Sequence, residues 1–133
     1  MKLQSRDFSF GIFVDDSAHN TKFFKVGPLV QIGATTSIQP DGSIYGLNDG
    51  YAQTKYILEK MLSSLEEAGA CLDDVTEVKM FTADMSRSSD YIKAFSEFFQ
   101  KLDTSFSLIK SDNMKNRREL IEIEMDAFID PEH

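Results

Sequence analysis

Three carboxylates alternate with apolar residues near the C-terminal end of the chain, within residues 120–129. The acidic positions are Glu122, Glu124 and Asp126, and the apolar positions between them are Ile121, Ile123, Met125, Ala127 and Ile129. Alternation with a period of two predicts a half-buried strand. A carboxylate on strand backbone is held rigidly enough for proton transfer. Glu122 is therefore a candidate catalytic residue, although alternation alone favours an exposed or interface carboxylate.

The remaining residue types that could do chemistry are few. A row of carboxylates could hold a divalent cation, but no histidine or turn ligand accompanies it, so solvated or paired carboxylates are favoured and we predict no metal site. Cys71 is the single cysteine, and the two histidines, His19 and His133, are distant from it in sequence. An inert thiol is therefore favoured over a nucleophilic one.

Basic residues that could receive an anion fall in two places. Arg87 follows Ser86 at the approach to a predicted helix, and four basic residues gather at Lys110, Lys115, Arg117 and Arg118. Charges in such a segment of an acidic protein are usually a solvated face. We keep both places as possible sources of a cation for a binding site.

Periodicity along the chain predicts the elements that must position these side chains. Strands are predicted over 8–14, 23–38, 74–83, 104–110 and 120–129. A hairpin is predicted in which a tight turn at Asp41-Gly42 leads into a short strand over 43–46. Polar segments at 15–22 and 111–118 are expected to be loops. One helix is predicted from the capping residue Asn48 or Asp49 to Ala68, ended by Gly69. A second is predicted from the capping residue Ser88 or Ser89 to Leu102.

This order allows both helices to pack on one face of a single sheet, so we predict one two-layer α+β domain over residues 1–133. The uncovered face of that sheet would be too apolar to be only solvated and too polar for a core. Its expected members are Leu29, Gln31, Glu77, Lys79, Phe81, Glu122, Glu124 and Phe128. A mixed face of this kind is typical of an interface between subunits.

Composition excludes several classes of function. The formal charge of -8 disfavours nonspecific nucleic-acid binding, which depends on clustered Lys and Arg. No apolar run is long enough to cross a membrane, and the first ten residues carry no apolar signal core. With one cysteine there is no intrachain disulfide, so we expect a cytoplasmic protein.

Four segments together resemble the RidA (YjgF, reactive intermediate deaminase) family. They are residues 26–36, Asp49 with Gln53-Thr54, residues 68–85 with Cys71-Leu72-Asp73-Asp74 and Thr82-Ala83-Asp84-Met85, and residues 120–124. No single segment is specific for the family, but the order and spacing of all four together are. The resemblance implies a chorismate-mutase-like fold with a mixed sheet. It also implies a homotrimer with a small-molecule cleft between each pair of subunits.

In the deaminating branch of that family, water converts a 2-imino acid into a 2-oxo acid and ammonia, so the resemblance implies that no cofactor is needed. The resemblance places the strand glycine at Gly33 and the water-orienting glutamate at Glu122. The family's arginine, which clasps the substrate carboxylate, sits fifteen or sixteen residues before that glutamate, where this chain has Phe106 or Ser107. Further differences are Phe10, where tyrosine is common, and Ser86, where asparagine is common.

Because this arginine is missing, we consider three hypotheses for the function. The first is a trimeric protein that binds or acts on a ligand other than a 2-imino acid, in a cleft with Gly33, Phe10, Ser86, Phe106 and Glu122. The second is a residual hydrolase of imines or enamines, in which Arg87, Arg117 or Arg118 replaces the missing cation. The third is an endoribonuclease or translation inhibitor, which the net charge disfavours. Homotrimer and heterotrimer both remain open.

Overall fold

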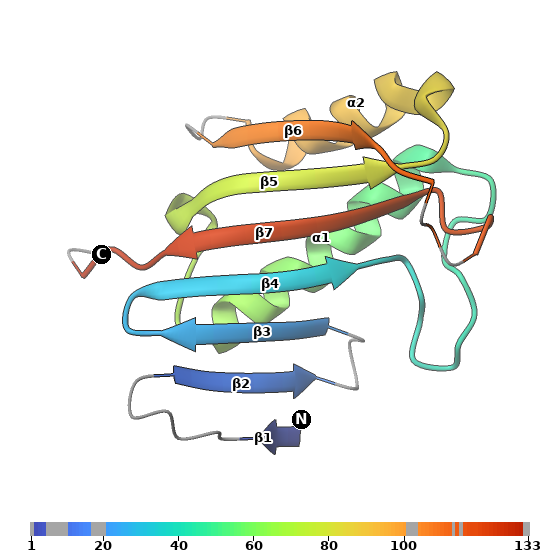
Figure 1. Cartoon of the computed structure of the whole chain (residues 1–133). Coiled ribbons are helices and arrows are strands. Elements are labelled where there is room, and N and C mark those ends of the chain that lie inside the picture. The colour runs from blue at the N-terminus through green and yellow to red at the C-terminus, as the bar shows by residue number, and fades with distance from the viewer. Residues whose placement is uncertain are drawn as a thin grey trace.

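The computed structural model describes residues 2–4, 11–16, 21–100, 104–112, 114 and 116–131. Its described strands form one seven-stranded sheet in the order β1-β2-β3-β4-β7-β5-β6, with two helices behind it (Figure 1). The pairing of β5 with β6 is parallel and the other neighbouring pairs are antiparallel. The sheet is therefore mixed, as predicted.

The strands and helices have the following bounds. The strands are β1 Lys2–Gln4, β2 Gly11–Asp16, β3 Thr21–Val26, β4 Leu29–Thr35, β5 Val75–Thr82, β6 Ser105–Lys110 and β7 Ile121–Phe128. The helices are α1 Gly50–Glu67 and α2 Ser88–Phe98, and short 3-10 turns lie at Leu72–Asp74 and Met85–Arg87. None of the described helices is long and apolar enough to cross a bilayer.

The core lies between the sheet and the two helices. Its members include Val30, Ile57, Leu58, Met61, Leu65, Val78, Met80, Tyr91, Ile121, Ile123 and Met125, all fully or almost fully buried. Both helices cover the same side of the sheet, so the opposite side is uncovered (Figure 1). This is the predicted two-layer α+β arrangement, and removal of this apolar surface from water is its main stabilising term.

Local signals at the ends of α1 are confirmed. The Asp49 side chain accepts a hydrogen bond from the backbone N–H of Ala52 at 3.0 Å, so Asp49 is the residue that caps the helix. Gly69 has φ +88°, the left-handed conformation that ends helices and that glycine adopts without steric cost. Both ends of this helix therefore follow from short-range interactions.

The predicted continuous strand over 23–38 is wrong. Gly27-Pro28 forms a tight turn with Gly27 at φ +54°, and the chain reverses so that β3 pairs with β4 through Val26 and Leu29. Glycine supplies the positive φ that such a hairpin turn requires. A β-bulge between Ile32 and Thr35 then reverses the alternation, so Thr35 is buried and Ala34 is exposed.

The N-terminal strand prediction over 8–14 is confirmed only in part. Strand β2 begins at Gly11 and continues to Asp16, two residues into the predicted loop over 15–22. Phe10, His19, His133 and Lys115 lie outside the described residues. The predicted hairpin at Asp41-Gly42 is present as a turn, with Gly42 at φ +90° and an isolated bridge between Ile38 and Ile44.

Lys60 attaches this hairpin to α1 from a buried position. The side chain is only 6% exposed, and its ammonium donates a hydrogen bond of 3.0 Å to the Ile38 carbonyl and lies 5.3 Å from the centre of the Tyr56 ring. Burial lowers the pKa of Lys60 to about 8, and the charge of Glu119 offsets part of this effect. The folded state thus binds the Lys60 proton less tightly than the unfolded state does.

This difference predicts a specific pH dependence of stability. Between pH 8 and the ordinary lysine pKa the unfolded chain holds more protons, so the free energy of unfolding should rise with pH. Relative to a Lys60→Met variant, the wild type should gain up to about 1.4 kcal/mol per pH unit in this window. Urea unfolding of both proteins from pH 7 to 9.5 measures the difference, and parallel curves would contradict it.

Candidate functional site

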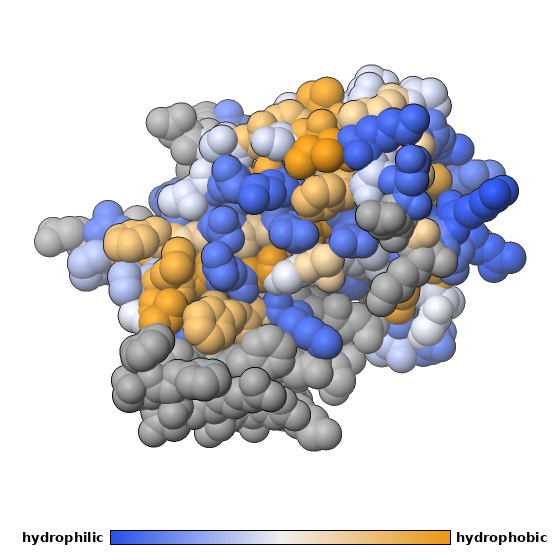
Figure 2. All heavy atoms as spheres, in the orientation of Figure 1, coloured by the Kyte–Doolittle hydropathy of each residue, from blue (hydrophilic) through white to orange (hydrophobic). Residues whose placement is uncertain are grey.

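The uncovered face of the sheet carries rows of side chains from neighbouring strands. Cross-strand pairing aligns Ser107, Lys79 and Glu124 in one row. The adjacent row contains Ser105, Glu77, Asp126, Gln31 and Phe24. Figure 2 shows hydrophilic side chains across the middle of this face, with apolar patches toward its ends. The predicted mixture of polar and apolar residues on the uncovered face is therefore present.

Two hollows lie on this face and share Glu124. The larger has a volume of about 380 Å³ and is lined by Lys22, Phe23, Phe24, Gln31, Ile32, Gly33, Glu77, Lys79, Glu124, Met125 and Asp126. The smaller has about 210 Å³ and is lined by Phe81, Ser111, Met114, Glu122 and Glu124. Because Glu124 lines both, the two hollows adjoin each other along β7.

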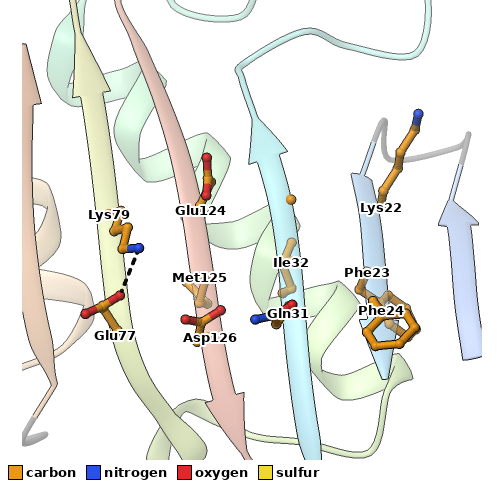
Figure 3. Close-up of a pocket in the computed structure, with 11 residues that line it drawn as sticks. Lys22, Phe23, Phe24, Gln31, Ile32, Glu77, Lys79, Glu124, Met125 and Asp126 are labelled. Carbon is orange, nitrogen blue, oxygen red and sulfur yellow. Dashed lines mark ion pairs between the residues drawn. The ribbon is translucent and has the colours of Figure 1, made fainter. Parts of the chain in front are cut away.

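The larger hollow is lined by three acidic residues and two lysines. Lys79 Nζ lies 3.4 Å from a carboxylate oxygen of Glu77, its neighbour two residues back on β5 (Figure 3). Asp126 is half-buried, and burial raises the pKa of its carboxyl, with a further increase from Glu77 and a partial offset from Lys79. The lining residues of this hollow therefore carry a net negative charge.

Gly33 and Glu122, the two positions at which the resemblance predicts site residues, lie on the adjacent strands β4 and β7 but in different hollows. Gly33 lines the larger hollow, and its carbonyl accepts a 2.8 Å hydrogen bond from the Thr35 hydroxyl. Glu122 is half-buried in the smaller hollow and pairs across the strands with Phe81. A ligand that contacts both residues would have to pass Glu124.

Phe106 does not lie where we expected. Its ring stacks on Phe95 of α2 with centroids 4.5 Å apart, and its strand partner is the core residue Val78. Phe106 therefore faces the helices and not the uncovered side. Ser107, fifteen residues before Glu122, is in register with Lys79 on the uncovered side. Of the two candidates for the arginine position, Ser107 is the one that could contact a ligand there.

Lys79 is a cation near the predicted arginine position that was not among the candidates from the sequence. It lies beside Ser107 on the neighbouring strand and lines the same hollow as Gly33. Alternation within residues 74–83 does place Lys79 on the uncovered face. Its proximity to Ser107, however, depends on the parallel register of β5 and β6, which no local pattern reports.

Ser86 and Arg87 are both bound to Asp84 at the end of β5. The Ser86 hydroxyl and backbone N–H donate to the Asp84 carboxylate, and Arg87 Nε lies 3.1 Å from it. Arg87 also donates to the carbonyl of Asn48 at 2.6 Å and to its side chain at 3.2 Å. The hydrogen bond from the Ser86 hydroxyl, and then those from Arg87 and the Ser86 N–H, lower the pKa of Asp84. The bonds to Asp84 and Asn48 hold Arg87 away from the two hollows.

The other candidate cations do not line either hollow, although the hollow that contains Arg117 shares Met114 with the one that contains Glu122. Arg117 lines a third hollow of about 390 Å³ together with Ala83, Asp84, Asp112, Met114, Glu119 and Leu120. Arg118 is exposed. Within the described part of the chain, no group of three or more His, Cys, Asp or Glu side chains is arranged to hold a metal ion.

Residues 16–129 match the family model described as endoribonuclease L-PSP. A RutC family protein of Pyrococcus abyssi is 32% identical over 75 residues. That match covers 56% of this chain and 59% of the relative, or about three fifths of the relative's length.

Solved structures show the same fold. A member of the YjgF/YER057c/UK114 family from Mycobacterium tuberculosis is 28% identical with a TM-score of 0.71, covering 80% of this chain and 84% of that one. A candidate endoribonuclease of Thermotoga maritima is 25% identical with a TM-score of 0.73, covering 81% and 84%. A Rid family protein of Yersinia pestis, at 21% identity, has a TM-score of 0.73 over 80% and 85% of the two chains.

Proposed function

Because this chain belongs to the endoribonuclease L-PSP family, which includes the RidA and YjgF proteins, we propose that it is a trimeric small-molecule-binding protein. Its ligand is not a 2-imino acid but a neutral compound or an amine. The cleft lies between subunits, on the uncovered face of the sheet, where the two hollows adjoin along β7. The single cysteine fits a reducing compartment, and we expect the protein in the cytoplasm.

The observation that carries this proposal is the charge of the hollows. Among the described residues that line them, there is no guanidinium. Carboxylates outnumber ammonium groups in the larger hollow, and the smaller contains Glu122 and Glu124. A ligand carboxylate would meet this negative charge without a bidentate partner, whereas an amine or a neutral polar group would not be repelled.

Support for a trimer comes from apolar side chains on the uncovered face. Phe128 is 53% exposed and Ile109 is 40% exposed, and Leu29 and Phe81 lie half-buried on the same side. Exposed apolar side chains beside polar residues are typical of an interface between subunits. Association of identical copies in a closed ring would bury it. Sedimentation velocity measures the number of subunits, and a stable monomer would contradict the trimer.

Ligand-induced thermal shifts test the chemical class of the ligand. At a concentration of 100 times its Kd, a ligand stabilises the folded protein by about 2.7 kcal/mol. We expect small amines or neutral amides to raise the melting temperature, and simple 2-oxo acids of the same size to have no effect. The opposite ranking would contradict the proposed ligand class. A Glu124→Gln variant should lose most of the amine effect because Glu124 borders both hollows.

One observation favours a second candidate, imine hydrolysis with Lys79 as the cation. Lys79 lies beside Ser107, and a lysine ammonium can hold a carboxylate as a point charge, although without the fork geometry of arginine. In this case Glu122 would orient the water that adds to the imine carbon, before the carbon–nitrogen bond breaks and ammonia leaves. Because lysine binds a carboxylate less tightly than arginine does, such an enzyme should be slow.

A hydrolysis assay separates the two candidates. With 2-iminopropanoate generated in situ, the first candidate predicts no acceleration above buffer. The second predicts an acceleration that Glu122→Gln lowers by about 10²- to 10⁴-fold, the usual contribution of a positioned acid or base. It also predicts loss of the acceleration in Lys79→Met, with partial rescue in Lys79→Arg. An acceleration that survives Lys79→Met would exclude Lys79 as the cation.

A further inference from the structure

Glu77 and Asp126 lie directly opposite each other on the antiparallel strands β5 and β7. Two carboxylates in this position repel each other, and such like-charged pairs are destabilising in sheets. A β-bulge between Val75 and Glu77 produces the register that brings them together. The Thr76 hydroxyl donates to the Asp126 backbone carbonyl at 3.3 Å, so the bulge is tied to β7 at this point.

The surroundings of this pair neutralise only part of its charge. On β5, Lys79 forms an ion pair with Glu77, and on β7, Glu124 lies on the same face. From β4 the uncharged Gln31 is opposite Asp126, from β6 Ser105 is opposite Glu77, and from β3 Lys22 reaches the edge of the hollow. Figure 3 shows Lys79 directed toward Glu77, while Lys22 points away from the pair.

We propose that association of subunits through the uncovered face is coupled to uptake of a proton by the Glu77–Asp126 pair. A proton on Asp126 removes the repulsion and allows the carboxyl O–H to donate to Glu77. Covering the face with another copy excludes water, which makes a second negative charge in the pair more costly. This proposal rests on the proposed trimer. Assembly should therefore be tighter at mildly acidic pH.

The raised pKa of Asp126 in the single subunit supports this direction, since burial and Glu77 already favour the protonated form before association. A group whose pKa is raised by folding or assembly binds more protons in that state. The free energy of forming that state then becomes less favourable as pH rises. For one proton per subunit, the association constant should fall by up to about tenfold per pH unit for each subunit joined.

The test compares two variants that each remove one negative charge from the face. Sedimentation velocity from pH 5 to 8 should show wild-type dissociation increasing with pH. Asp126→Asn should assemble tightly throughout and lose the dependence, because the amide resembles the protonated acid. Glu124→Gln should retain the dependence. Wild-type assembly that is independent of pH, or an Asp126→Asn curve parallel to the wild type, would overturn the proposal.

Two further outcomes are distinguishable. A wild type that is monomeric at every pH would overturn the proposed trimer itself. If the trimer is too tight to dissociate, NMR titration of the Asp126 carboxyl carbon provides the second measurement. Its midpoint should lie well above the ordinary aspartate value of about 3.9, and Glu77→Gln should lower it. A midpoint at or below that value in the assembled protein would overturn the proton linkage and leave the trimer intact.

Discussion

Replacement of Gln53 by methionine is expected to lower the free energy of unfolding by about 3–5 kcal/mol. Gln53 is fully buried in α1, and its side-chain amide donates to the Gly46 carbonyl at 3.1 Å and to the Arg118 carbonyl at 2.8 Å. Its oxygen accepts from the Leu120 N–H at 2.9 Å. Methionine has a similar volume but makes none of these bonds, so the polar backbone groups lose their partner.

Guanidinium chloride unfolding followed by circular dichroism measures this effect. Gln100→Met, at an exposed position just beyond α2, is the matched control and should change stability by less than about 0.5 kcal/mol. A loss below 1 kcal/mol in Gln53→Met would show that these three hydrogen bonds contribute little to stability. Because Leu120 directly precedes β7, the same variant should also displace Glu122 and weaken ligand binding.

Replacement of Tyr91 by alanine is the second large effect, with an expected loss of about 3–5 kcal/mol from the deleted ring. Tyr91 is fully buried on α2, and its ring packs so closely against Gly50 that a Cβ atom there would lie 2.9 Å from Cε1. The hydroxyl lies 3.0 Å from the Thr82 hydroxyl and 3.2 Å from the Asp84 carbonyl. One side chain therefore joins α1, α2 and the end of β5.

A set of variants separates the ring from the hydroxyl. Tyr91→Phe should cost only about 1 kcal/mol, the net value of a typical hydrogen bond. Gly50→Ala should destabilise the wild type through its close approach to the ring. The same change should be less harmful in Tyr91→Ala, where the space is free. Equal costs of Gly50→Ala in both backgrounds, measured by chemical unfolding, would contradict this packing.

The difference between Phe106 and Ser107 illustrates what a sequence pattern leaves undecided. A count of fifteen or sixteen residues before Glu122 reaches either of these two neighbours, and neighbours on a strand face opposite sides. The alternation within 104–110 is weak because Ser105, Phe106 and Ser107 would fit either orientation. The stacking of Phe106 on Phe95 and the register with β5 decide the question.

At Gly27-Pro28 the turn-forming residues predict a break, whereas the longer run of strand-forming residues around them predicts one continuous strand. The apolar and β-branched residues on both sides suggest one strand, although glycine and proline are the residues that form tight turns. The bulge between Ile32 and Thr35 is harder to predict from the sequence, because it depends on pairing with β7. It reverses the faces of Ala34 and Thr35, which strict alternation cannot predict.

The sequence by itself determined the alternating faces of β5 and β7, the end of α1 at Gly69, and, from the order of the elements, the two-layer arrangement with one uncovered face. The strand faces and the helix end depend on backbone period and on contacts within a few residues. Only the tertiary structure decided which side chains meet across strands. The pairing of Lys79 with Ser107 and of Glu77 with Asp126 depends on register and on a bulge, because a shift of one residue turns a whole strand over.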